Sequence, residues 1–142
     1  WDSRRRECPG SGPRHLQSTV LGIMRIAVAY MFTLHGTAKI FGIPHSPAFD
    51  GLQIMSLYGV AGILEIVGGI LLLLGLFTRP VAFILSGMMA VAYFVGHAIP
   101  NGNVAAPFLN RGEAAALFSF VFLYFSVAGG GKWSLDGKRN AA

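Results

Sequence analysis

The sequence predicts an all-α fold: an integral membrane four-helix transmembrane bundle with both termini cytoplasmic. Of the 142 residues, 54% are hydrophobic and only 12% are charged, which is about half the charged fraction of a soluble domain. Four apolar segments of roughly membrane-spanning length follow one another. No alternation of period two is present, which argues against a membrane β-barrel and leaves helices as the spanning elements.

The first 15 residues differ from the rest of the chain. They are basic, contain several glycines and prolines, and include the lone cysteine, Cys8. We interpret residues 1–15 as a disordered basic tail or as artefactual sequence that precedes the true start. A single cysteine excludes an internal disulfide framework and a multi-cysteine metal site, and we predict no metal site.

A four-helix domain is predicted over residues 16–130. Its apolar segments are residues 18–41, 54–77, 81–99 and 113–128. The loop between the first two segments is rich in turn-forming residues. Thr78, Arg79 and Pro80 form a very short link, so the second and third helices should be antiparallel neighbours. Three glycines end the fourth helix, and residues 131–142 are predicted to be a short cytoplasmic tail.

The basic residues predict the orientation. In a four-span protein, the N-terminal tail, the 78–80 link and the C-terminal tail lie on one side of the membrane. That side holds Arg4, Arg5, Arg6, Arg14, Arg79, Lys132, Lys138 and Arg139, whereas the other has Arg111 and, at a helix end, Lys39. Both termini are therefore predicted to be cytoplasmic. Because these charges lie at the edges of apolar segments, we expect the lipid bilayer and no nucleic acid as a partner.

Glu65 is the most informative residue, because its apolar segment carries no other charge. A charged side chain at the bilayer centre costs roughly 2.5–3.5 kcal/mol on insertion scales. The first segment offers Arg25, His35 and Lys39 as partners. Relative to Arg25, Lys39 lies about 40° and His35 about 80° around the helix, all to one side. We predict that these four residues form an internal polar site, with Arg25 or His35 as the natural partner of Glu65.

Small residues border these polar groups. Gly22, Ala29 and Gly36 form a stripe at heptad spacing, and Ala61, Gly62, Gly68 and Gly69 flank Glu65. Such faces allow helices to approach closely. On the third segment, Ser86, Tyr93 and His97 share a face, so His97 should join His35 and Lys39 in the outer half of the bundle.

Structural interpretations of the same residues remain open. Arg25 and Lys39 are near enough to helix ends to extend to the two membrane surfaces. Glu65 would then only fix helix register, and the histidines would be hydrogen-bonded interface residues. A haem held between His35 and His97 is disfavoured, because their depths differ by about one helical turn.

Over about residues 16–138 the chain resembles the DoxX family of small four-helix bacterial inner-membrane proteins, and three stretches of the sequence carry the resemblance. They are LGIMRIAVAYMFTLHGTAKIFG, GVAGILEIVGGILLLLGLFTRP and NRGEAAALFSFVFLYFSVAGGGKWSLDG. One departure is Gly130, where the family often has Pro or Ala. The resemblance implies a multi-pass protein of the bacterial inner membrane that is similar to a subunit of a thiosulfate:quinone oxidoreductase. It also implies links to quinone or thiol-oxidant stress and to complexes with soluble redox enzymes.

The functional hypothesis is an integral membrane subunit of a quinone-linked oxidoreductase that acts in thiol, sulfur or quinone redox stress. The candidate catalytic residues are Glu65, Arg25, His35 and Lys39, and the candidate quinone contacts are His35, His97 and Tyr93. Glu65 would pass protons, and the electrons would come from a partner or a bound cofactor. Two alternatives stay open: a non-catalytic membrane anchor that docks soluble redox enzymes at the cytoplasmic face, and a small transporter that works as a homo-oligomer.

Overall fold

The computed structural model of the protein describes residues 13–141, so the predictions for the N-terminal tail fall mostly outside the described residues. This part of the chain is all-helical and contains no strand. The helices are α1 (Arg14–Phe41), η1 (Pro47–Phe49), α2 (Leu57–Leu74), α3 (Thr78–Val91), η2 (Ala92–Ala98), α4 (Glu113–Ala128) and α5 (Leu135–Ala141). The predicted all-α membrane fold is confirmed.

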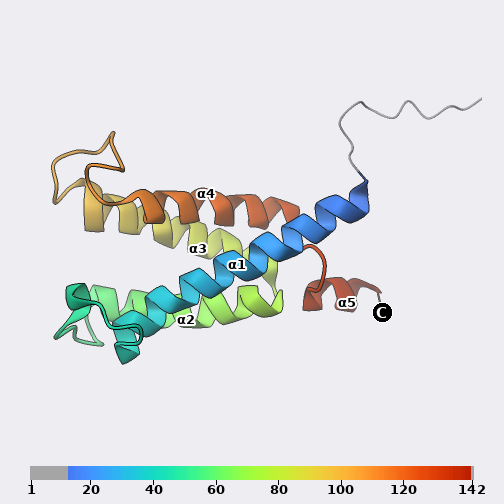
Figure 1. The fold of residues 1–142 in the computed structure, drawn as a ribbon, viewed down its shortest axis with the longest axis horizontal. Coiled ribbons are helices and arrows are strands. Elements are labelled where there is room, and N and C mark those ends of the chain that lie inside the picture. Colours follow the sequence, from blue (N-terminus) through green and yellow to red (C-terminus); the bar gives the residue numbers. More distant parts are fainter. Residues whose placement is uncertain (1–12, 142) are drawn as a thin grey trace, which may run out of the picture.

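The four long helices pack as two pairs, α1 with α2 and α3 with α4 (Figure 1). The loops 42–56 and 99–112 lie at one end of the bundle, which we call the loop end. The short α2–α3 link and α5 lie at the other end, which we call the tail end. Three helical stretches are long and apolar enough to cross a membrane: α1, α2, and α3 together with η2. Helix α4 is apolar but has only 16 residues, so the four-span count and the side of the termini remain predictions.

Local capping explains where α2 begins and ends. Ser56 caps the N-terminus, because its Oγ accepts a hydrogen bond of 3.2 Å from the amide of Gly59. Gly75 ends the helix in the left-handed conformation, with φ 68°. The predicted segment 54–77 was therefore too long at both ends. Helix α3 starts at Thr78, earlier than predicted, because Pro80 lies in the first turn, where a helix needs no backbone donor.

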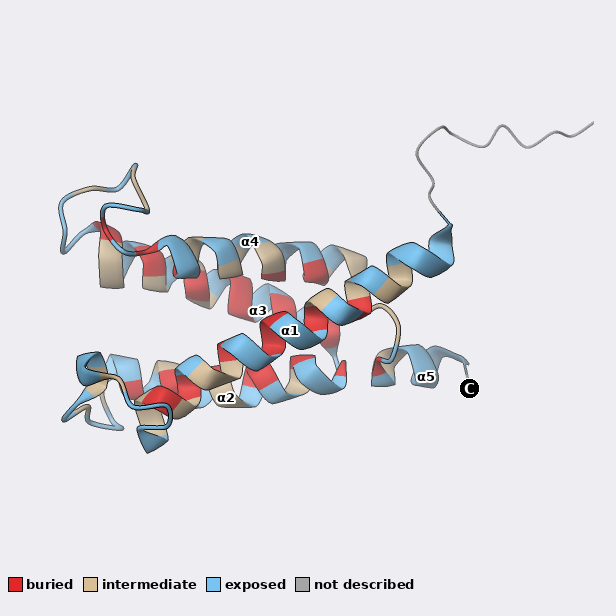
Figure 2. Cartoon of the chain, in the orientation of Figure 1, coloured by how far each residue is buried: buried red, intermediate tan, exposed pale blue. Residues whose placement is uncertain are grey.

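Close backbone contact joins α1 to α2. A Cβ atom at Gly36 would lie 2.8 Å from the carbonyl oxygen of Gly62, so only glycine fits there. Gly22, from the same predicted stripe, lies against a different segment. A Cβ atom there would lie 2.6 Å from the carbonyl oxygen of Lys132, in the turn after α4. The buried residues accordingly follow the inward sides of the helices (Figure 2).

Hydrogen bonds between two serines join α3 to α4, and aromatic contacts join α4 to α1. The Ser86 hydroxyl donates to the Ser119 carbonyl at 2.8 Å, and the Ser119 hydroxyl donates to the Ser86 carbonyl at 3.0 Å. Phe32 of α1 packs edge-on against Phe122 of α4, with ring centroids 4.8 Å apart, and both side chains are fully buried. These rings form the centre of the apolar core and connect the two helix pairs.

The Arg25 side chain, which is 0% exposed, links the tail ends of three segments. Its Nη1 donates to the carbonyls of Leu72 and Leu73, both at 2.6 Å. Its Nε donates to the Gly130 carbonyl at 2.7 Å. Its Nη2 donates to Trp133 at 3.2 Å and, more weakly, to Lys132 at 3.4 Å. The carbonyls of Leu72 and Leu73 lie in the last turn of α2, where a helix leaves acceptors without partners and carries partial negative charge.

The residues after Gly131, predicted only as a short tail, fold back onto the bundle. The Lys132 amide donates to the Ser18 carbonyl of α1 at 3.0 Å. The Asp136 carboxylate accepts from the amides of Phe77 and Thr78, at 2.9 and 2.8 Å, and thereby caps the start of α3. The tail is therefore part of the folded domain at its tail end.

Replacing Arg25 with Met should strongly destabilise the bundle. The variant keeps the apolar stem but removes every donor to the five carbonyls, and we expect a loss of about 3 kcal/mol or more. Thermal unfolding in detergent micelles measures this. Arg14→Gln is the matched control, since Arg14 is exposed on the same helix. A midpoint for Arg25→Met equal to that of the control would contradict the role assigned to Arg25.

The Asp136 cap should depend on pH. Burial raises the pKa of the Asp136 carboxyl, but hydrogen bonds from Thr78 and Phe77 and the charge of Arg139 lower it, and the resulting pKa lies below its ordinary value. A lowered folded-state pKa stabilises the fold above the unfolded-state value of about 3.9, and this stabilisation is lost as pH falls through the folded-state value. Protection of the Phe77 and Thr78 amides from hydrogen exchange should hold from pH 7 to about 4 and then fall.

Asp136→Asn should show weak protection of these two amides already at pH 7. Asp50→Asn, at the exposed loop end, is the control and should behave like the wild type. The same protection in Asp136→Asn and in the wild type at neutral pH would show that the carboxylate does not act as a cap.

Candidate functional site

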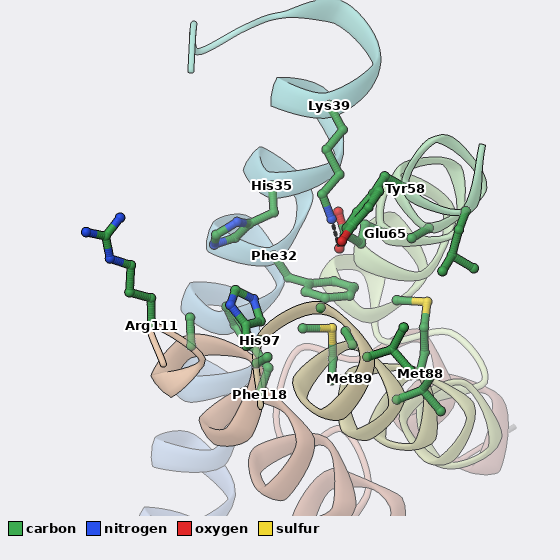
Figure 3. Close-up of a pocket in the computed structure, with 18 residues that line it drawn as sticks. Phe32, His35, Lys39, Tyr58, Glu65, Met88, Met89, His97, Arg111 and Phe118 are labelled. Carbon is green, nitrogen blue, oxygen red and sulfur yellow. Dashed lines mark hydrogen bonds and ion pairs between the residues drawn. The ribbon is translucent and has the colours of Figure 1, made fainter. Parts of the chain in front are cut away.

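A cavity of about 470 Å³ lies between the two helix pairs near the loop end (Figure 3). This volume is within the usual range of small-molecule sites, about 300–1,000 Å³. All four long helices contribute to its wall, because antiparallel neighbours bring the ends of α1 and α3–η2 beside the starts of α2 and α4. The labelled residues around it are Phe32, His35, Lys39, Tyr58, Glu65, Met88, Met89, His97, Arg111 and Phe118.

A buried ion pair stands in the wall of this cavity. The Lys39 Nζ atom of α1 lies 2.6 Å from Glu65 Oε1 of α2, and their side chains are only 12% and 4% exposed. Lys39 also lies over the Phe49 ring, 5.6 Å from its centroid. The second carboxylate oxygen, Glu65 Oε2, is buried and has no hydrogen-bond partner. An unpaired buried carboxylate oxygen is costly, so this atom is the chemical feature of the site that most needs a partner.

The structure gives Glu65 the partner Lys39 rather than Arg25 or His35. Arg25 lies 14 positions before Lys39, a rise of about 21 Å along α1, and is bonded to carbonyls at the tail end. It therefore does not share the cavity. Lys39, Glu65 and His35 do share it, so the structure brings together three of the four candidate catalytic residues.

The two candidate histidines both line the cavity. The His35 ring packs edge-on against Phe118, with centroids 5.8 Å apart, while His97 is carried by η2, a π-helical stretch of seven residues. Helical stretches of this type occur often at functional sites. Arg111 also contributes to the wall, although its side chain points away from the centre in Figure 3. His35, His97, Lys39 and Arg111 therefore line the same cavity as Glu65, and Lys39 contacts it directly.

Tyr93, the third candidate quinone contact, is not part of the cavity wall. Its hydroxyl donates to the Val104 carbonyl at 2.7 Å and accepts from the Asn110 amide at 3.0 Å. Asn110 is fully buried and also donates to the Asn103 carbonyl. Tyr93 therefore anchors the loop 99–112, and this loop positions Arg111.

Sequence reasoning did not find several wall residues. Tyr58 precedes Glu65 by seven residues and so lies on the same face of α2, which was a usable signal. The apolar wall is formed by Phe32, Met88, Met89 and Phe118, and such residues look like any other core residue in a sequence. Their grouping around one cavity depends on how the helix pairs diverge, which the sequence does not display.

Comparison with known proteins places this architecture in a family. The profile described as DoxX matches residues 20–98, more than half of the chain. The chain belongs to the DoxX family. No solved structure matches it.

Three relatives match most of the chain. A Haemophilus influenzae protein named "Uncharacterized protein" is 52% identical over 119 residues, 83% of this chain and 89% of its own length. "Inner membrane protein YphA" of Escherichia coli is 30% identical over 82% of this chain and 88% of its own. "Putative oxidoreductase CatD" of Bacillus subtilis is 29% identical over 83% and 89%. The family, these relatives and the three long apolar helices confirm a multi-pass protein of the bacterial inner membrane.

Energetic coupling between Lys39 and Glu65 can be measured with a double-mutant cycle. Lys39→Met alone leaves a buried carboxylate without a partner, and Glu65→Gln alone leaves a buried ammonium, so each should destabilise by about 3 kcal/mol. The double variant should lose less than the sum of the two, because it removes both charges. Unfolding in detergent micelles gives the coupling energy. Additive losses would mean that the two side chains are not paired in the membrane protein.

Proposed function

We propose that this DoxX chain is a membrane subunit of a quinone-linked oxidoreductase that acts in thiol, sulfur or quinone redox stress. In this proposal the cavity holds the quinone head group. The observation that carries it is the buried Glu65 carboxylate, which is paired with Lys39 through one oxygen only. The name of the Bacillus subtilis relative, an oxidoreductase, supports the same class of chemistry.

The residues of the cavity fit a quinone. A quinone presents two carbonyl acceptors on a flat apolar ring, whereas a quinol presents two hydroxyl donors. The Lys39 ammonium has donors beyond the one it gives to Glu65, and Glu65 Oε2 is a free acceptor. Phe32, Phe118 and the Met88–Met89 pair supply aromatic and thioether surfaces that suit a flat ring.

The ion pair can match both oxidation states of the ligand. Lys39 donates to a carbonyl oxygen, and the Glu65 carboxylate accepts from a hydroxyl. When protonated, Glu65 becomes a donor as well. A bound quinone would supply a carrier of two electrons and two protons. Within the proposal, Glu65 holds the proton that moves to or from the ring oxygen, and Lys39 stabilises the carboxylate that remains when the proton has left.

In this proposal, protons reach and leave Glu65 by way of the two cavity histidines. His35 and His97 line the same cavity as Glu65, and imidazole is the side chain best suited to exchange protons near neutral pH. The positive-inside rule predicts that the loop end faces the periplasm. In this proposal the site therefore exchanges protons with the periplasmic side, and a partner protein or a further bound group provides the electrons.

Retention of quinone by the purified protein tests this function. The protein would be placed in nanodiscs with a short-tailed benzoquinone and separated from free ligand, and the bound quinone would be extracted and quantified by its absorbance. Glu65→Gln and Lys39→Met should each weaken binding about 10- to 100-fold, as expected for a lost hydrogen bond to a charged group. Glu113→Gln is the control, because Glu113 is exposed near the same end but does not line the cavity.

The outcome separates the proposal from its alternatives. Wild-type protein that retains no quinone, or a Glu65→Gln variant that retains as much as the wild type, would sink the proposal. If replacing the exposed tail residues Lys138 and Arg139 with Ala, which keeps the bonds of Arg25 and Asp136, then abolishes capture of a soluble redox enzyme, the anchor hypothesis gains support. Flux of solutes through proteoliposomes would instead support a transporter.

A further inference from the structure

One side of the cavity wall, between α2 and η2, is weakly packed. Helix α1 packs mainly along α2, and η2 packs against α3 and α4, but α2 and η2 form no comparable contact with each other. Both contribute to the wall: α2 through Leu57, Tyr58, Ala61 and Glu65, and η2 through Ala92, Val95, Gly96 and His97. On this side, individual side chains form the wall of the cavity, and no closely packed helix–helix interface closes it.

Tyr58 is the side chain that spans this gap. Its hydroxyl lies 3.9 Å from the position that a Cβ atom would occupy at Gly96, and nothing else comes within 4 Å of that position. The Tyr58 hydroxyl has no hydrogen-bond partner among the described residues, and the residue is exposed. Gly96 thus leaves room beside Tyr58. The Tyr58 hydroxyl lies close to η2 but forms no hydrogen bond with it.

The surface around this gap is apolar. Leu57 on α2 and Val91 and Val95 on α3–η2 all line the cavity, and all three are also exposed on the outside of the bundle. Both α2 and α3–η2 are membrane-spanning by length and composition, so this outside surface meets lipid. The polar wall residues Lys39 and Glu65 have side chains only 12% and 4% exposed, whereas Tyr58, which lies beside them in Figure 3, is 48% exposed.

We propose that the ligand of this cavity arrives from the lipid phase, between α2 and η2, and passes Tyr58 and Gly96. The inference rests on the proposed function and specifies its ligand: a ring compound dissolved in the membrane, whose apolar tail stays between Leu57 and Val95 while the ring reaches Lys39 and Glu65. Tyr58 acts as a movable barrier that separates the buried ion pair from the acyl chains.

A second route is available at the loop end, where Arg111, next to the start of α4, lines the cavity and is exposed. Hydrophilic molecules would use that route and would not need to pass Tyr58. The two routes therefore predict different responses when the lipid side is blocked, and comparing a long-tailed with a short-tailed ligand separates them.

Gly96→Phe tests the proposal by filling the space beside Tyr58. Gly87→Phe is the matched control, because Gly87 is on the same helical stretch, is exposed, and has no atom within 4 Å of its Cβ position. Stopped-flow mixing of nanodiscs with vesicles that carry a decyl-tailed quinone would measure the rate of uptake. We expect Gly96→Phe to slow uptake about tenfold or more relative to Gly87→Phe, with little effect on a tail-less, water-soluble quinone.

Tyr58→Ala is the complementary variant, and it protects the test against misfolding of Gly96→Phe. Removing the barrier should speed uptake of the decyl-tailed quinone several-fold. Equal rates for both quinones in the wild type and in all three variants would overturn the route and leave quinone binding intact. Absence of binding by the wild type would instead overturn the proposed function. Slowing of the water-soluble ligand alone would place the access route at the loop end.

Discussion

The structure depends on one buried guanidinium whose partners are backbone carbonyls. Arg25 donates to carbonyls at the end of α2 and in the glycine-rich turn after α4. A charged side chain inside the membrane region normally calls for a carboxylate, but here acceptors at a helix C-terminus stabilise it. These hydrogen bonds join α1, α2 and the tail at the tail end of the bundle. The absence of a side chain at Gly22 allows the turn after α4 to pack directly on α1. With the tail end fixed, the helix pairs can separate at the loop end and leave a cavity.

Arg25 and Glu65, the two charged residues with the lowest exposure among the described residues, differ in how many of their polar atoms have hydrogen-bond partners. All of Arg25's nitrogen atoms have acceptors, which is the pattern of a structural group. Glu65 has a partner for one oxygen and none for the other, and that oxygen belongs to a cavity-lining residue. A residue left incompletely bonded at a cavity is the pattern of a group that meets a ligand. The distinction comes from hydrogen bonds and not from burial, since both side chains are buried.

The sequence predicted the fold because apolar length and low charge are properties of segments, and they do not depend on tertiary contacts. It could not separate Arg25 from Lys39. Both lie on one side of α1, and the choice between them as partner of Glu65 depends on how far α2 extends toward each end. Ser56 and Gly75 cap α2 and so set its extent. The predicted segment 54–77 ran past both capping residues. Tyr93 was predicted to be a quinone contact, but the loop after η2 turns back, and its Val104 carbonyl accepts a hydrogen bond from the Tyr93 hydroxyl.

Helix α4 has 16 residues, whereas α1 has 28, so their lengths are about 24 and 42 Å. The hydrocarbon core of a typical bilayer is about 30 Å thick. If α4 crosses the membrane, the bilayer beside it must thin or the loop 99–112 must enter the headgroup layer, whereas α1 is long enough to tilt or to extend beyond the hydrocarbon. The bilayer around the protein would then be thinner beside α4 than beside α1. Its helix packing would respond to the acyl-chain length of the host membrane as well as to bound ligand.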